Sequence, residues 1–199
     1  MELLLVRHAQ PERVDDGLEP ADPGLTPAGL GQAQQLAKAF AAGAFGPVDA
    51  IVSSSMLRAR QTAEPVAETL GLTARTDERL AELDLGWTTY GAELDNIPSR
   101  RAAYDELNAG RWGPDTYDPG DFAARVRAGV EDVVTGQPHG TVAVVCHGGV
   151  ISAYLANVVG AARMLFLVPD HCSVTRVLAE RDGYREVLSV NESLHMRTV

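Results

Sequence analysis

Arginine and histidine side chains suited to phosphoryl chemistry stand at three places in the chain. Arg7 and His8 are adjacent, Arg58 ends a serine-rich stretch, and His147 precedes Gly148. Guanidinium groups and free backbone amides at the start of a helix both bind a phosphoryl dianion, because they present several donors to its oxygens. Brought together, two arginines, two histidines and such amides would form a cage for a phosphoryl group.

Each of these places directly follows an apolar run with the pattern of a buried strand, and helical patterns lie between and after the runs. The predicted strands are residues 3–6, 50–52 and 141–146, and the predicted helices cover 30–40, 59–70 and 150–158. Strands that alternate with helices indicate an α/β fold, a three-layer α/β/α sandwich with a mostly parallel central sheet. The carboxyl ends of parallel strands converge on one crevice, so the three clusters are expected to meet there.

The remaining patterns are weaker. Residues 173–179 and 186–190 alternate enough to predict a hairpin that turns at Asp182-Gly183. Residues 165–168 are apolar and are predicted to form a buried strand rather than an interface patch. Pro65 lies inside a helical pattern, so we expect a kink there or a later helix start.

Length and charge restrict the class of protein. The 199 residues suit a single domain, taken as 1–199, and the formal net charge is -10. An acidic chain is a poor binder of nucleic acid or of an anionic membrane, so neither is expected as a partner. Two cysteines are too few for a disulfide framework, and no apolar run is long enough for a signal peptide or a membrane span, which favours a cytoplasmic location.

Five short motifs stand in order along the chain. They are Leu4 to Ala9, Leu25-Thr26 with Gly29 and Gln32-Ala33, Ser54 to Ala59 with Gln61 to Ala63, Glu82 with Gly86-Trp87, and Val145 to Gly149. In this order they resemble the motifs of the histidine phosphatase superfamily, which includes the cofactor-dependent phosphoglycerate mutases and many small-molecule phosphatases. The resemblance covers nearly the whole chain and implies a phosphoglycerate mutase-like fold.

The resemblance also implies a role for each site residue. His8 is the nucleophile, Glu82 is the proton donor, and the phosphate pocket consists of Arg7, Arg58, His147 and Gly148. These roles are chemically reasonable, because a neutral imidazole can attack phosphorus and a carboxylic acid can protonate the departing alkoxide. The scheme needs no metal and no other cofactor. By spacing alone Asp84 competes with Glu82, and only the resemblance selects Glu82.

The leading hypothesis is a metal-independent phosphatase that hydrolyses small phosphomonoesters through a phosphohistidine intermediate. A phosphoglycerate mutase-type phosphotransferase is less favoured, because the basic and aromatic residues that mutases carry after the acid are missing from residues 83–85. A phosphohistidine protein phosphatase and a non-catalytic protein that binds a phosphorylated metabolite are further alternatives. The expected partner is a small phosphorylated metabolite, and the chain is expected to be a monomer or a homodimer.

Residues 86–122 hold six of the chain's eleven aromatic residues among glycines and prolines. Such a segment could form a lid or specificity excursion, or its aromatic side chains could pack on one another. Arg100, Arg101 or Arg111 within it could meet a second anionic group on the substrate. His171 is interpreted as an ordinary surface histidine rather than as a group behind the phosphate pocket.

Overall fold

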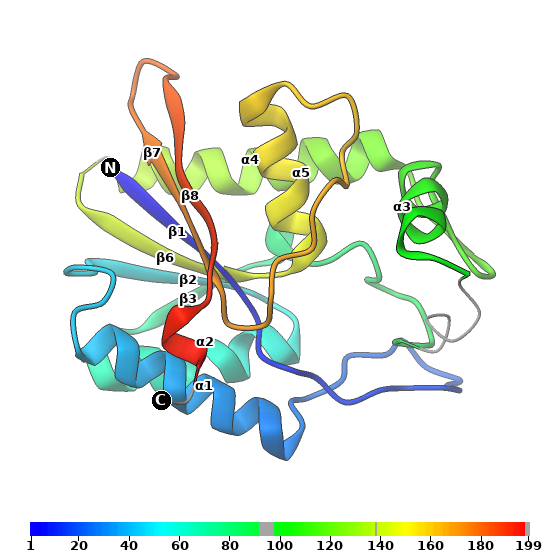
Figure 1. The fold of residues 1–199 in the computed structure, drawn as a ribbon, viewed down its shortest axis with the longest axis horizontal. Helices are drawn as coiled ribbons and strands as arrows, with labels where there is room; N and C mark the ends of the chain where they lie inside the picture. Colours follow the sequence, from blue (N-terminus) through cyan, green and yellow to red (C-terminus); the bar gives the residue numbers. More distant parts are fainter. Residues whose placement is uncertain (92–97, 138, 198–199) are drawn as a thin grey trace.

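The computed structural model describes residues 1–91, 98–137 and 139–197 (Figure 1). One six-stranded sheet forms its centre, with the strand order β3-β2-β6-β1-β7-β8. The strands are β1 Glu2–Arg7, β2 Ala50–Ser54, β3 Ala74–Asp77, β6 Thr141–Cys146, β7 Val174–Ala179 and β8 Arg185–Glu192. The strands β3, β2, β6 and β1 are mutually parallel, whereas β7 and β8 are antiparallel to their neighbours. The predicted mostly parallel sheet, its three predicted strands and the terminal hairpin are therefore confirmed.

Helices cover both faces of the sheet. They are α1 Pro27–Ala41 and α2 Leu57–Leu70 on one face, and α4 Pro119–Gly136 and α5 Gly148–Val159 on the other (Figure 1). Alternate side chains of strand β1 point to opposite faces of the sheet and so belong to two separate parts of the core. Leu4 and Val6 pack with α1 and α2, while Leu3 and Leu5 pack with α4 and α5. These layers confirm the predicted α/β/α sandwich.

The register of the central strands brings the predicted site together. Arg7, the last residue of β1, pairs with Cys146, the last residue of β6. The His8 N–H continues this pairing by donating to the Cys146 carbonyl (2.9 Å). His8 and His147 therefore leave the sheet side by side at the carboxyl edge, where ligands of parallel sheets bind.

One expectation about local structure is wrong. Residues 165–168 form a loop between α5 and β7, because side chains rather than a neighbouring strand satisfy their backbone. Asn108 bonds both the N–H (2.9 Å) and the carbonyl (2.8 Å) of Leu165, and Ser152 accepts the N–H of Phe166 (3.0 Å). Helix α2 starts at Leu57 and runs through Pro65, so of the two effects expected of the proline, the later helix start does not occur.

Between the end of β3 and α4 the chain leaves the sandwich. It forms the 3-10 turn η1 Glu78–Leu80, the helix α3 Arg100–Asn108 and the short hairpin of β4 Arg111–Trp112 and β5 Asp115–Thr116. After β8 the chain forms the 3-10 turn η3 Leu194–Met196. Helix α3 stands to one side of the sheet (Figure 1). Within the described ranges, no helix combines the length and the apolar character that crossing a membrane requires.

Candidate active site

Four of the predicted residues meet at the carboxyl edge of the sheet. The rings of His8 and His147 lie 5.0 Å apart between their centroids, and Arg7 and Arg58 are the charged groups that most lower the pKa of His8. Arg58 reaches the site from the first turn of α2. The carboxylate of Asp22 accepts the N–H of Leu57 (2.8 Å) at the start of that helix and so fixes the turn out of β2. The structure thus brings together the side chains that the sequence placed at three separate strand ends.

The hydrogen bonding of His8 determines which ring nitrogen can react. Its Nδ1 lies 2.7 Å from the carbonyl oxygen of Ala9, which can only accept a hydrogen bond. Nδ1 therefore carries the ring proton, and the lone pair is on Nε2. Burial, followed by the nearby Arg58 and Arg7 guanidinium groups, holds the pKa of His8 well below its usual value. His8 is consequently a neutral imidazole with a nucleophilic Nε2.

Arg58 is held by a carboxylate and an aromatic ring. Its Nη2 donates to both oxygens of Asp84 (2.8 and 2.9 Å), and the ring of Tyr90 lies 4.6 Å from its Cζ. Arg7 donates from Nη1 to the carbonyl of Pro169 (2.6 Å). Among the described residues, Arg7 Nε and Arg58 Nε and Nη1 are buried without a hydrogen-bond partner. Because unpaired buried donors are costly and rare, these atoms indicate a site for an anion with several acceptor oxygens.

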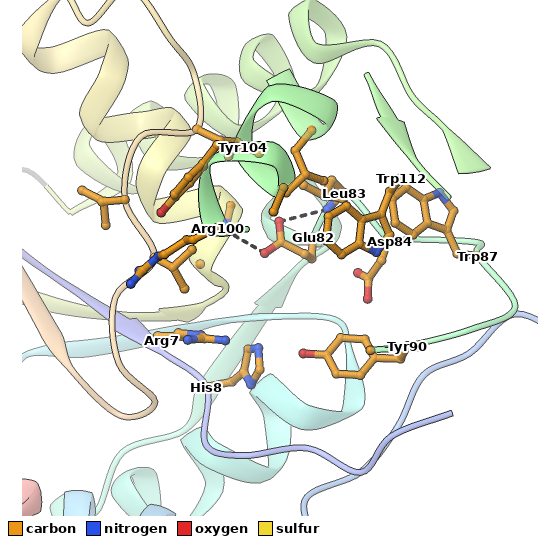
Figure 2. A pocket seen from close by; sticks show the side chains of 18 of the residues that line it. Arg7, His8, Glu82, Leu83, Asp84, Trp87, Tyr90, Arg100, Tyr104 and Trp112 are labelled. Atoms are coloured by element: carbon orange, nitrogen blue, oxygen red, sulfur yellow. Dashed lines mark hydrogen bonds between the residues drawn. The ribbon is translucent and has the colours of Figure 1, made fainter. Parts of the chain in front are cut away.

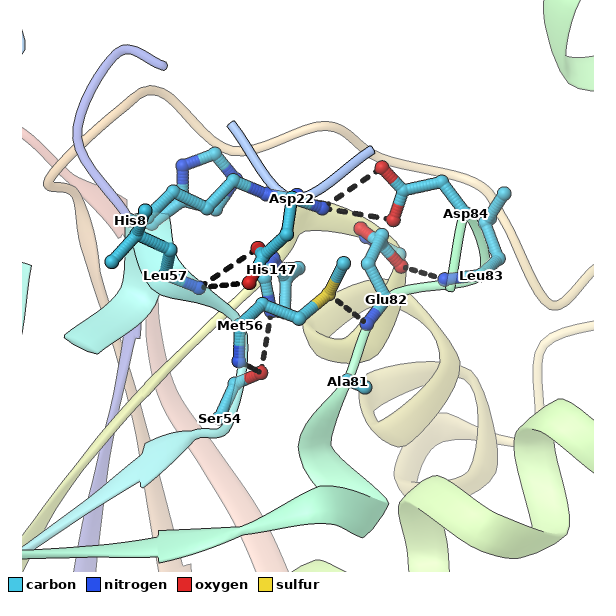
Figure 3. Close-up of polar contacts among 12 residues, drawn as sticks. His8, Asp22, Ser54, Met56, Leu57, Ala81, Glu82, Leu83, Asp84 and His147 are labelled. Carbon is cyan, nitrogen blue, oxygen red and sulfur yellow. Dashed lines mark hydrogen bonds and ion pairs between the residues drawn. The ribbon is translucent and has the colours of Figure 1, made fainter. Parts of the chain in front are cut away.

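His147 adds a further donor to the same place (Figure 3). Its Nε2 lies 2.8 Å from the Ser54 hydroxyl, and that hydroxyl accepts the N–H of Met56 (3.3 Å). When the hydroxyl donates to Nε2, the ring proton is on Nδ1, which has no partner in the described part of the chain. Burial, followed by the charge of Arg58, lowers the pKa of His147 well below its usual value. A neutral His147 can then donate from Nδ1 to a phosphate oxygen.

Glu82 is the carboxyl group best placed to exchange a proton with a substrate. It lines the same cavity as His8, and its oxygens accept the N–H groups of Gly149 (2.7 Å) and Leu83 (3.0 Å). Burial, followed by the charge of Asp84, raises the pKa of Glu82. Asp84 uses both of its oxygens on Arg58, so the geometry favours Glu82 over its sequence competitor.

One interpretation from the sequence is wrong. His171 is half-buried, and its ring centroid lies 5.6 Å from that of His8, so it is a neighbour of His8 and not an ordinary surface histidine. Burial and then Arg7 lower its pKa to about 4. The irregular loop before β7 carries the ring to this position, and no short sequence pattern marks such a loop.

The structural roles of three other residues were not foreseen. Asp84 and Tyr90 hold Arg58, as described above. Arg125, on α4, donates from Nη1 to the carbonyls of Ala81 (2.9 Å) and Arg79 (2.9 Å), and so secures the segment that leads into Glu82. Only the approach of an arginine from a distant helix creates this contact, so spacing along the chain gives no signal for it.

A cavity of about 520 Å³ opens from this edge of the sheet (Figure 2). Arg7, His8 and Gly148 line one end, and residues of the 86–122 segment, among them Tyr104 and Trp112, line the other. Of the arginines singled out in that segment, Arg100 lines the cavity. Arg101 and Arg111 are exposed and face Asp105 (3.9 Å) and Glu106 (3.0 Å) instead.

Known proteins resemble this chain in sequence and in fold. Residues 3–192 match the family model of the histidine phosphatase superfamily (branch 1). A protein of Hydrogenobacter thermophilus named "Putative phosphoserine phosphatase 2" is 30% identical, with 98% of this chain and 97% of the relative covered. The glucosyl-3-phosphoglycerate phosphatase of Mycobacterium tuberculosis is 36% identical over 64% of this chain and 61% of its own length. A solved structure of a mycobacterial glucosyl-3-phosphoglycerate phosphatase complexed with vanadate (VO3) superimposes with a TM-score of 0.76 at 26% identity, covering 96% of this chain and 99% of that one.

Proposed function

This chain belongs to the histidine phosphatase superfamily and is a phosphomonoester hydrolase, and we propose that His8 and Glu82 carry its chemistry. Arg7, Arg58, His147 and the start of α5 at Gly148 hold the phosphoryl group. The substrate is a small phosphorylated metabolite.

The first step transfers the phosphoryl group to the protein. His8 Nε2 attacks phosphorus in line with the ester oxygen, a P–N bond forms and the P–O bond to the leaving group breaks. The proton on the Glu82 carboxyl moves to the departing oxygen, so the leaving group departs as an alcohol. The raised pKa of Glu82 supports this role, because it favours the protonated acid.

The second step returns the protein to its starting state. Glu82, now a carboxylate, takes a proton from a water molecule that attacks the phosphohistidine. The P–N bond breaks, inorganic phosphate leaves, and the lone pair returns to His8 Nε2. Throughout, charge is spread over the equatorial oxygens of the transferring group, and the arginine and His147 donors stabilise it.

The observation that carries the proposal is the set of unpaired donors around the nucleophile. Arg7 Nε, Arg58 Nε and Nη1, and His147 Nδ1 are buried without partners among the described residues, next to a His8 ring whose Nε2 lone pair is available. A mutase would also need cationic groups for a second anion. Beyond the phosphate end, the described wall of the cavity offers only Arg100, which favours hydrolysis over phosphoglycerate mutation.

Several predictions stand beside this function. We propose that residues 1–199 form one histidine phosphatase domain and that residues 86–122, of which 92–97 lie outside the described residues, determine specificity. A cytoplasmic location and a monomeric or homodimeric state are part of the same proposal. The scheme uses no metal ion. In the described part of the chain, no three acidic, histidine or cysteine side chains are grouped as a metal site would require.

The test is hydrolysis of p-nitrophenyl phosphate with and without a chelator, for the parent protein and for His8→Ala and Glu82→Gln. We expect activity that withstands the chelator and disappears in His8→Ala. Because p-nitrophenolate leaves without a proton, Glu82→Gln should lose less activity on this ester than on an alkyl phosphate. Chelator-sensitive activity, activity that survives in His8→Ala, or equal losses on the two esters for Glu82→Gln would contradict the proposed roles.

A further inference from the structure

The wall of the cavity away from the phosphate end begins with one face of α3. Arg100, Ala103, Tyr104 and Leu107 all line the cavity, and their spacing of three, four and seven residues places them on a single helical stripe. No residue of α3 is fully buried. Apart from the Arg100 guanidinium and the Tyr104 hydroxyl, this stripe is therefore an apolar surface that the protein itself leaves partly uncovered.

A loop lines the cavity as well. Leu165, Leu167 and Val168 line it from the segment between α5 and β7. Asn108, at the end of α3, bonds the backbone of Leu165 on both sides, so the helix and the loop are tied to each other. These hydrogen bonds fix the distance between the apolar stripe of α3 and the apolar side chains of the loop.

Aromatic and aliphatic side chains make up most of the remaining wall, together with the hydroxyl-bearing Thr89, Tyr90 and Ser99 (Figure 2). Leu83 and Trp87 follow Glu82 along the chain, and Trp112 comes from the hairpin after α3. The ionisable side chains Arg7, His8, Glu82 and Asp84 gather at the phosphate end, where each already has a role. Among the described lining residues, Arg100 is the one charged side chain outside that group, and it is exposed.

We propose that the cavity selects phosphomonoesters with an apolar leaving group, an alkyl or aryl body that fills the space between α3 and residues 165–168. The inference rests on the proposed phosphatase function and specifies its substrate class. A leaving group of this kind would cover the apolar stripe of α3 and gain the free energy of removing that surface from water. The volume of about 520 Å³ lies within the range of pockets that enclose a small organic molecule.

A polar leaving group fits the same wall poorly. The amino acid part of phosphoserine carries an ammonium and a carboxylate, and a sugar carries hydroxyls, all of which lose hydrogen bonds to water on entry. The described wall offers the hydroxyls of Thr89, Tyr90, Ser99 and Tyr104 in exchange, but most of its side chains are apolar. Arg100 could pair with one carboxylate, but the described wall holds no unpaired carboxylate for an ammonium. Burying such groups without partners is unfavourable, so polar esters are expected to react more slowly than apolar esters of equal size.

The first experiment measures kcat/KM for n-alkyl phosphates from ethyl to hexyl. The leaving alcohols in this series have nearly equal pKa values, so differences report binding in the cavity rather than chemical reactivity. We expect kcat/KM to rise by up to about fourfold for each added methylene, the factor that corresponds to about 0.8 kcal/mol per buried CH₂. Propyl phosphate should also exceed O-phosphoserine, which has the same number of carbon atoms.

Substitutions of cavity-lining residues test whether the rise in kcat/KM per methylene comes from contacts with the cavity wall. Leu107→Ser on α3 and Leu167→Ser in the loop should each reduce the rise per methylene, while the rate on ethyl phosphate changes less than the rate on hexyl phosphate. Phe166→Ser is the matched control, because Phe166 is adjacent to Leu167 but 41% exposed and is not one of the residues that line the cavity. It should retain the full rise.

The outcomes separate this inference from the function on which it rests. Failure to hydrolyse any of these esters, with no phosphate released from p-nitrophenyl phosphate, would overturn the proposed function itself. Hydrolysis without a rise along the alkyl series, or O-phosphoserine reacting faster than propyl phosphate, would overturn the apolar class and leave the phosphatase intact. Equal slopes for Leu107→Ser, Leu167→Ser and the parent would also overturn it, because they would place the apolar contacts elsewhere.

Discussion

Replacing Asp84 by asparagine tests how Arg58 is held in the phosphate cage. Both Asp84 oxygens accept from Arg58 Nη2 (2.8 and 2.9 Å), and the two side chains are 0% and 8% exposed. This pairing directs Nη2 away from the substrate and leaves Nε and Nη1 for phosphate oxygens. Asp84→Asn preserves the volume and one acceptor oxygen but removes the charge that orients the guanidinium.

The size of the effect follows from the burial of this pair. A hydrogen bond to a charged group contributes about 1.5–3 kcal/mol, and breaking a buried ion pair outright costs about 3–5 kcal/mol. Because asparagine still accepts one hydrogen bond, we expect about 2–3 kcal/mol to be lost from transition-state stabilisation. That loss corresponds to a fall in kcat/KM of about 30- to 150-fold.

A pH profile distinguishes this positioning role from a general loss of structure. The charge of Asp84 also raises the pKa of Glu82, so its removal should move the alkaline limb of the kcat/KM profile to lower pH. Inhibition by vanadate should weaken together with kcat/KM, because both depend on Arg58. Asp132→Asn is the matched control, since Asp132 pairs with Arg79 at the surface with 64% of its side chain exposed, where such pairs contribute little. Parent-like kcat/KM together with an unmoved alkaline limb in Asp84→Asn would refute the reasoning.

Three further predictions concern the nucleophile, the acid and the segment that carries the acid. The pH profile of kcat/KM for an alkyl phosphate should have an acid limb well below the usual histidine pKa, because His8 must be neutral. Its alkaline limb should lie above the usual glutamate pKa, because Glu82 must be protonated. An alkaline limb that persists in Glu82→Gln would contradict the assignment of Glu82. Gly149→Ala should lower kcat by at least about tenfold, since a Cβ there overlaps the Glu82 carboxylate, while Gly31→Ala, with open space around its Cβ, should match the parent in the same assay. Arg125→Met should lower kcat about tenfold with little change in KM, because Arg125 holds the backbone of residues 79–82 and does not bind the phosphate. Arg127 is an exposed arginine on the same helix, so Arg127→Met is the control. A parent-like kcat in Arg125→Met, or an equal loss in Arg127→Met, would count against this role.

Much of the site was predictable because its residues depend on local pattern and general sheet geometry. Arg7, His8 and His147 each follow a β-branched or leucine-rich run, and the parallel arrangement of these runs brings their ends together. Arg58 was predictable in the same way, because it follows the run that forms β2, although the predicted helix 59–70 began after it and the helix itself begins at Leu57. Once the alternation of strands and helices is recognised, the three layers follow.

The missed features depend on contacts between distant segments. Strand β3 is short and largely polar, and only its pairing with β2 makes it a strand. Residues 165–168 were predicted to form a strand because they are apolar. Leu165, Leu167 and Val168 instead line a cavity, Phe166 is exposed, and Asn108 satisfies the backbone of Leu165. His171 read as a surface residue because its neighbourhood is created by a loop that returns to His8. The structures of β3 and of residues 165–168 and the position of His171 can therefore be recognised only once the fold is known.

The central claim is that the phosphoryl group passes through His8. The most direct measurement is rapid acid-free quenching of the protein during turnover of an alkyl phosphate, followed by peptide mass spectrometry. We predict a phosphoryl group on His8 that is stable in alkali, labile in acid, and absent from His8→Ala. Turnover by the parent protein with no phosphorylated His8 under conditions that stabilise phosphohistidine, or with the phosphoryl group on another residue, would contradict the account.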